Sequence, residues 1–173
     1  MNLNLHILKD ELAELSFTGV IHTEPWDFPI AHPYLYDDST LQASPAAVYI
    51  TEAEHMPETS WAGLPLCILC IGKPDHLWLE GNCSLIYTES SISVTRLLNL
   101  VIEVFRKYQL LEQQFDSAVE NRCTLRELGE LIMPFINNPI FLSGSLFQCI
   151  FQIFPEKLQT LTPRQKEYLE NIR

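Results

Sequence analysis

Residues 66–71 read LCILCI, a run in which every side chain is apolar. A strand that is apolar on both faces is typical of a parallel sheet with helices on both sides. Residues 47–51 (AVYIT) have the same character, and residues 20–22, 76–79 and 85–88 are also predicted to be short strands. These runs predict an α/β fold built on a small, mostly parallel sheet.

The same run contains a CxxC pattern, formed by Cys67 and Cys70. Residues three apart in a strand point to opposite faces, so these two sulfurs are not expected to share a metal or a disulfide. The chain has five cysteines, an odd number. We expect them to be reduced thiols, as in a cytoplasmic protein.

The segment before the first strand has leucines at 5, 8, 12 and 15, which predicts an amphipathic helix ended by Thr18-Gly19. Residues 23–46 contain four prolines and few periodic apolar positions. They are predicted to form a long loop without a regular element.

A long helix is predicted from Ile92 to about Glu120, where the chain has no Gly or Pro. Its apolar side chains recur with a seven-residue period at Val94, Leu98, Val101, Phe105, Tyr108, Phe115 and Val119. A second apolar stripe marks only the first half, at Leu97, Leu100 and Val104. We expect the first half to pack on the sheet. The seven-residue stripe, hereafter the seam, is expected to form a two-fold dimer together with an apolar hairpin at 140–154. The alternative is a core helix that lies wholly against its own sheet.

After this helix the sequence predicts a short helix and a hairpin. Thr124 with Glu127 predicts a capping box that opens another helix, and residues 140–142 and 146–154 predict an apolar hairpin. A second capping box at 162–165 predicts a final helix to residue 173. The expected organisation is an α/β domain (1–91), a connecting helix (92–122) and the start of a second module (123–173), as in the N-terminal piece of a longer protein.

Charge is unevenly distributed along the chain. Residues 1–95 hold 13 acidic and two basic side chains together with all five histidines, whereas residues 96–173 hold nine of each sign. The acidic first part disfavours contact with nucleic-acid phosphates. No apolar run approaches the roughly 18 residues of a membrane span, so no membrane partner is expected.

Candidate catalytic groups lack a diagnostic spacing. The possible metal ligands are His22, Glu24, Asp27, His32, Glu52, Glu54 and His55. None of them forms an HxxxH or HxH pattern, so we expect no metal and no cofactor. Cys83 with His76 could form a nucleophile pair, but nothing places Cys83 at a helix start. Phosphate-binding glycine motifs are absent, and we expect the chain not to be an enzyme.

Aromatic residues offer a binding alternative, since rigid rings on loops often line ligand pockets. The candidates are Trp26, Phe28, Tyr34, Tyr36 and Trp61. They would accept a small planar or apolar ligand, neutral or cationic because of the acidic surroundings. Equally, they could fold back and cover the sheet.

The capped helix that follows the long helix, and then residues 137–142 (NNPIFL), resemble a bacterial regulator family. The order of elements over residues 1–154 is similar to the N-terminal region of PucR-type transcriptional regulators. The resemblance implies an effector domain, a long helix and the start of a GAF- or PAS-like module, with a helix-turn-helix domain beyond residue 173. It therefore implies a dimeric, cytoplasmic sensor of a small-molecule effector. The alternatives are a ligand-free oligomerisation module or a small metal-dependent or thiol enzyme.

Overall fold

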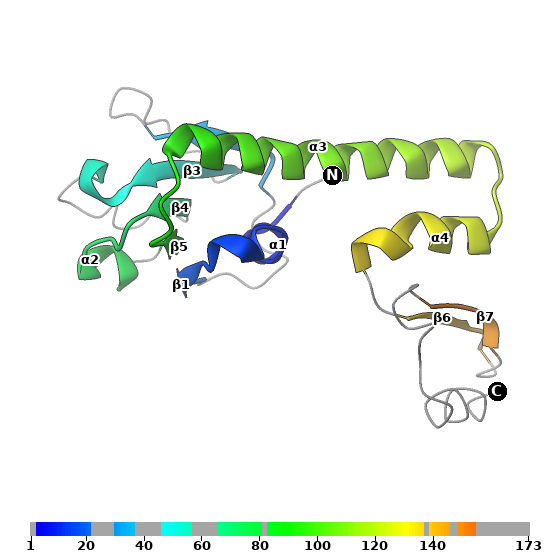
Figure 1. Cartoon of the computed structure of the whole chain (residues 1–173). Coiled ribbons are helices and arrows are strands. Elements are labelled where there is room, and N and C mark those ends of the chain that lie inside the picture. Colours follow the sequence, from blue (N-terminus) through cyan, green and yellow to red (C-terminus); the bar gives the residue numbers. More distant parts are fainter. Residues whose placement is uncertain are drawn as a thin grey trace. The chain divides into compact units, whose positions relative to one another are not determined.

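The computed structural model describes residues 3–21, 30–36, 46–56, 66–80, 83–136, 139–145 and 149–154 (Figure 1). The chain divides into two compact units, residues 1–108 and 109–173. The boundary falls inside the long helix α3 (Val94–Glu120), which supplies residues to both units. The sequence predicted this helix as a connecting segment, residues 92–122.

The first unit contains a five-stranded sheet in the order β1-β5-β4-β3-β2. The strands are β1 (Thr18–Val20), β2 (His32–Leu35), β3 (Ala47–Glu52), β4 (Cys67–Ile71) and β5 (Ser84–Thr88). Strands β2 to β5 run parallel to their neighbours, and only β1 is antiparallel. The predicted α/β class and mostly parallel sheet are therefore confirmed, with the run at 66–71 as the central strand.

The two faces of β4 belong to two separate apolar cores. Cys67 and Leu69 face one core, whereas Ile68 and Cys70 face the other. The strand alternation that excluded a shared CxxC site is thus confirmed, because the two sulfurs lie on opposite sides of the sheet.

Helix α1 (Leu5–Glu11) and the first half of α3 cover the first of these faces. Asn4 caps α1, its side chain accepting a hydrogen bond from the backbone N–H of Ile7 at 2.9 Å. The leucines of α1 are buried together with Leu97 and Val101 of α3. This face holds most of the large buried side chains of the unit, so the long helix is part of its core.

The other face is covered by the short helix α2 (His76–Leu79), where the sequence predicted a strand. That prediction was wrong because Asp75 acts as a helix cap, accepting from the backbone N–H of Leu77 at 3.0 Å. Trp78 is the only buried residue of α2. It anchors the helix on the second core, while Leu77 is half exposed.

Strand β2 lies where a loop without regular structure was expected, and Pro33 explains why the sequence concealed it. The backbone N–H of His32 donates to the carbonyl of Ala46, just before β3, and that of Tyr36 donates to the carbonyl of Ile50 within β3. The alternate residue Pro33 therefore faces the outer edge, where its missing N–H costs no hydrogen bond. Strand β2 is an edge strand and tolerates proline.

Strand β1 begins at Thr18, two residues before the strand predicted at 20–22, and it includes the Thr18-Gly19 pair that was predicted to end the helix. A 3₁₀ turn (Ala13–Leu15) ends the helical segment, and Ser16 adopts a left-handed conformation. Gly19 has φ +137°, and a Cβ there would lie 2.2 Å from the carbonyl oxygen of Leu85 in β5. The close approach of β1 to β5 depends on this glycine.

Helix α4 (Leu125–Ile136) and the antiparallel hairpin of β6 (Ile140–Ser143) and β7 (Cys149–Ile153) lie in the second unit. The predicted capping box is confirmed, because Thr124 N–H donates to the Glu127 carboxylate at 2.6 Å and Glu127 N–H donates to Thr124 Oγ1 at 3.3 Å. Pro134 lies inside α4 without ending it. The predicted helix from 162 to 173 lies outside the described residues.

The turn between α3 and α4 has the hydrogen bonds of a Schellman motif. Cys123 N–H donates to the carbonyl of Ala118, and Arg122 N–H donates to that of Val119, both at 3.0 Å. Arg122 occupies the left-handed position, with φ +55°, where glycine is usual. This turn ends α3 and lets the chain reverse into α4, as Figure 1 shows.

Candidate functional site

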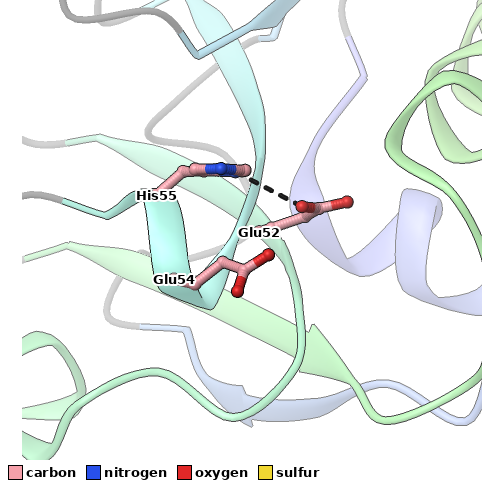
Figure 2. A group of neighbouring side chains, drawn as sticks. All are labelled: Glu52, Glu54 and His55. Atoms are coloured by element: carbon pink, nitrogen blue, oxygen red, sulfur yellow. Dashed lines mark ion pairs between the residues drawn. The ribbon is translucent and has the colours of Figure 1, made fainter.

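Three potential metal-ligating side chains meet at the carboxyl end of β3 (Figure 2). One donor atom each from Glu52, Glu54 and His55 lies within 4.8 Å of the other two. His55 Nδ1 is 3.3 Å from Glu52 Oε2. The Glu52 side chain is 31% exposed and the His55 side chain 67%, so the group is open to solvent on one side.

Local backbone geometry brings these three residues together. Glu52 is the last residue of β3, and Ala53–His55 form a 3₁₀ turn closed by a hydrogen bond from Met56 N–H to the Ala53 carbonyl. In such a turn, residues three apart lie nearly above one another. The spacing i, i+2, i+3 therefore converges here, although it matches no helical ligand pattern.

Glu52, Glu54 and His55 were among the possible ligands in the sequence, but no metal site was expected from their spacing. The signal that could have revealed it is their position directly after a buried parallel strand, since ligands of open α/β sheets often bind outside the carboxyl ends of the strands. The other candidates of this group separate: His22, Glu24 and Asp27 lie outside the described residues, and the ring of His32 contacts Tyr34.

Within the part of the chain that the structure describes, His55 forms an ion pair with Glu52 when its imidazole is protonated (Figure 2), and no lysine or arginine pairs with either glutamate of the cluster. Lys107 pairs with Glu11, and Arg126 pairs with Glu130. The two carboxylates of Glu52 and Glu54 therefore lie close together in a part of the chain that has few cations to offer them.

Cys70 lies near this cluster but is fully buried. Burial raises the pKa of its thiol to about 12, and the negative charge of Glu52 contributes to the rise. The thiol donates a weak hydrogen bond to Met56 Sδ at 3.7 Å. A neutral, buried thiol is a poor nucleophile and a poor metal ligand, so Cys70 serves the core.

Cys83, considered as a nucleophile from the sequence, is also a buried thiol with a raised pKa. Its side chain is buried, and burial raises the pKa of its thiol. Its suggested partner His76 is exposed and has Nδ1 2.6 Å from Asp75 Oδ1. Neither residue has the environment of an activated thiol–imidazole pair.

The aromatic candidates are only partly described, because Trp26, Phe28 and Trp61 lie outside the described residues. Tyr34 is half exposed on β2, and its ring stacks on Tyr49 of β3 with centroids 6.2 Å apart. Tyr49 was not among the aromatic candidates from the sequence, and the parallel register places it directly opposite Tyr34. Tyr36 follows at the end of the strand and is half-buried.

The first five seam residues of α3 turn toward their own domain. Val101 and Phe105 are buried in the core that α1 and the sheet form, and Val94, Leu98 and Tyr108 pack against it. The two seam residues of the second half differ, since Phe115 is half-buried and Val119 is 57% exposed. Only these last two residues can offer much surface to a partner.

Glu11 links α1 to α3 close to the boundary between the units. Its carboxylate accepts hydrogen bonds from Lys107 Nζ at 2.7 Å and from the Tyr108 hydroxyl at 2.9 Å. Burial and the Glu11 carboxylate together raise the pKa of Tyr108 above its ordinary value. The contact fixes α3 on α1 at its last turn within the first unit.

Among the described helices, none combines the length and the apolar character needed to cross a membrane. No protein-family model, curated protein or solved structure matches this chain significantly.

Proposed function

We propose that this chain is the signal-sensing, dimerising part of a bacterial transcriptional regulator of the PucR type and has no enzymatic activity. The observation that carries the proposal is the continuity of α3. Its first half is buried in the core of the α/β unit, and the same helix continues beyond Tyr108 into the second unit. A helix of 27 residues extends over about 40 Å.

Such a helix suits signal relay, because a change in the core that holds its first half acts directly on a helix that continues into the second unit. Two contacts make that attachment firm. Glu11 binds Lys107 and Tyr108, and the hydroxyls of Thr88 and Ser90, just before α3, donate to the carbonyl of Leu15. An effector that binds two packings of this core unequally would shift the helix between two positions.

The proposed effector site comprises Trp26, Phe28, Tyr34, Tyr36 and Trp61. Its support is the half-exposed ring of Tyr34, which Tyr49 holds in place by stacking. A planar, neutral or cationic molecule fits an aromatic ring in an acidic domain. The start of a GAF- or PAS-like module in the second unit belongs to the same proposal.

The proposed homodimer uses the second half of α3 and the apolar hairpin. The burial of Val101 and Phe105 removes these residues from the dimerisation surface expected from the sequence, because they are committed to their own core. Among the seam residues, Phe115 and Val119 remain available for the proposed dimer contact. The hairpin adds Phe141 and Ile150, each about half exposed.

Sedimentation equilibrium at micromolar concentration tests this arrangement. Val119→Glu, alone and with Phe115→Glu, is expected to shift the chain to monomer, because a charge would be buried at the interface. Leu110→Glu is the matched control. Leu110 is 53% exposed, and nine residues at 100° each place it opposite Val119 on the helix. A wild-type chain that is strictly monomeric, or equal responses of both positions, would contradict the dimer.

Ligand binding separates the sensor from its two alternatives. A planar effector at 100 times its dissociation constant should raise the free energy of unfolding by about 2.7 kcal/mol, and Tyr34→Ala should abolish that gain. A ligand-free oligomerisation module would dimerise without any such response. A small metal-dependent or thiol enzyme would instead turn over a substrate, and the purified chain would lose that activity when its metal is removed or its thiols are alkylated. Specific binding of duplex DNA by these 173 residues would contradict the placement of DNA recognition elsewhere.

A further inference from the structure

We propose that Glu52, Glu54 and His55 bind a divalent transition-metal ion of the Zn²⁺ class through two carboxylate oxygens and one imidazole nitrogen. The proposal goes beyond the regulatory function and does not depend on it. It reverses the expectation of a metal-free chain that the ligand spacing in the sequence suggested.

The distances fit a small tetrahedral ion. With zinc–nitrogen and zinc–oxygen bonds of 2.0 to 2.1 Å, adjacent ligand atoms in a tetrahedron are about 3.4 Å apart. Glu52 Oε2 and His55 Nδ1 are already 3.3 Å apart. Glu54 Oε lies within 4.8 Å of both and has to approach by no more than about 1.4 Å, which the rotation of one exposed side chain provides.

Two of the donors are held in place before an ion arrives. Glu52 is the final residue of a strand that is hydrogen-bonded on both sides, and its side chain is partly buried. His55 is on the 3₁₀ turn that follows at once. A neutral imidazole changes tautomer to expose the Nδ1 lone pair, and a water molecule completes the fourth position.

The chemistry of the donors selects the class of ion. Two carboxylates that pair with no lysine or arginine among the described residues attract a divalent cation, which would replace the proton of His55 as the partner of Glu52. Mg²⁺ and Ca²⁺ prefer oxygen ligands alone, whereas the imidazole of His55 favours Zn²⁺, Co²⁺ or Ni²⁺. The nearby Cys70 thiol is buried and hydrogen-bonded to Met56, so a thiolate site for a soft monovalent ion is not formed.

The chain contains its own control for adventitious binding. His76 and Asp75 form a second imidazole–carboxylate pair, with 2.6 Å between Nδ1 and Oδ1. Both of these side chains are more than 60% exposed. This pair offers two donors, and no third His, Cys, Asp or Glu joins it within the part of the chain that the structure describes. Two exposed donors should bind Zn²⁺ far more weakly than three.

The test is a calorimetric titration of the tag-free, metal-stripped chain with Zn²⁺, together with the visible absorption of bound Co²⁺. We expect one ion per chain and a tetrahedral Co²⁺ spectrum. His55→Ala and Glu52→Gln should each weaken Zn²⁺ binding by at least about tenfold, the lower limit of the effect of losing even a supporting group at a metal site. His76→Ala should leave the affinity unchanged.

Three results would overturn the site. They are the absence of saturable Zn²⁺ binding at 100 µM, Zn²⁺ binding that His55→Ala does not weaken, and an equal loss from His76→Ala. Circular dichroism of each variant identifies misfolding, and Glu54→Gln, at an exposed position, provides a ligand variant with little risk to the fold. Because the readout is metal affinity alone, its failure leaves the dimer test above unaffected.

Discussion

The carboxylate of Glu11 lies 2.9 Å from the hydroxyl of Tyr108 and joins two helices through residues that are 97 positions apart in the sequence. The hydroxyl donates this bond, and the ammonium of Lys107 donates to the same carboxylate. Since the Glu11 side chain is only 20% exposed, water competes weakly for it. The stability that α3 gains by packing on α1 can therefore be probed by removing this one hydrogen bond.

Tyr108→Phe should lower the free energy of unfolding by about 1 kcal/mol at neutral pH, the usual value of one partly buried hydrogen bond. Burial and Glu11 raise the pKa of Tyr108 above the ordinary 10.0, so the folded chain holds this proton more tightly than the unfolded chain does. Stability from this source is full below pH 10 and is lost as the pH rises further. Urea unfolding at pH 7 and above pH 10 checks both parts, and the variant should lose less stability in alkali. An unchanged alkaline loss in the variant would contradict the assignment.

Gly19→Ala should destabilise the first unit by more than about 2 kcal/mol, because a Cβ would meet the Leu85 carbonyl at 2.2 Å and φ is +137°. Gly72→Ala is the matched control. It also has a positive φ, +82°, but its nearest contact is the Ala53 Cβ at 3.4 Å, so it should cost only about 1 kcal/mol. Denaturant midpoints of the two variants measure the difference, and equal losses would show that β1 does not pack as closely as described.

Arg122→Gly should raise the stability of the second unit by roughly 1 kcal/mol, since glycine adopts the left-handed conformation of this turn without steric cost. Arg122→Ala serves as the comparison, because it removes the side chain and keeps the unfavourable backbone conformation. Thermal unfolding followed by circular dichroism distinguishes them. A gain from alanine equal to that from glycine would assign the effect to charge.

Cys67 and Cys70 should resist thiol reagents in the folded chain, whereas the half-buried Cys123 should react. Burial raises the pKa values of Cys67 and Cys70 to about 11 and 12, from the usual 9.0. Their protons are held more tightly in the folded state, so the stability that they contribute is lost as the pH rises above 9. Peptide mapping after brief alkylation at pH 8 measures the order of reaction. Rapid labelling of Cys67 or Cys70, or a disulfide between them, would contradict their burial on opposite faces.

The sequence predicted the elements whose pattern is local. The apolar runs at 47–51 and 66–71, the capping box at Thr124 and the extent of α3 needed no information from elsewhere in the chain. Helix α2 and strand β2 were missed because one rests on a single buried side chain, Trp78, and the other contains a proline. β2 is a strand because it pairs with β3, and such pairing cannot be predicted from the strand propensities of its own residues.

The candidate site shows the same limit. The types of Glu52, Glu54 and His55 were noted, but their convergence depends on where β3 ends and on the 3₁₀ turn that follows. Likewise, the apolar period correctly predicted that α3 is a helix, but it did not indicate which of its residues pack against the first unit. Burial of Val101 and Phe105 depends on the position of α1, which a helical period does not encode.

Pro33 bears on the colloidal behaviour of the chain. An exposed sheet edge invites strands of other molecules to add to it, and such growth leads to aggregates. Along the outer edge of β2 the outward positions are Pro33 and Leu35, so an incoming strand would find one amide donor where it needs two. Replacing Pro33 by valine would restore the second donor and turn a terminated sheet into one that can be extended. Pro33 made β2 difficult to predict from the sequence. The same residue prevents the chain from polymerising by the addition of strands to β2.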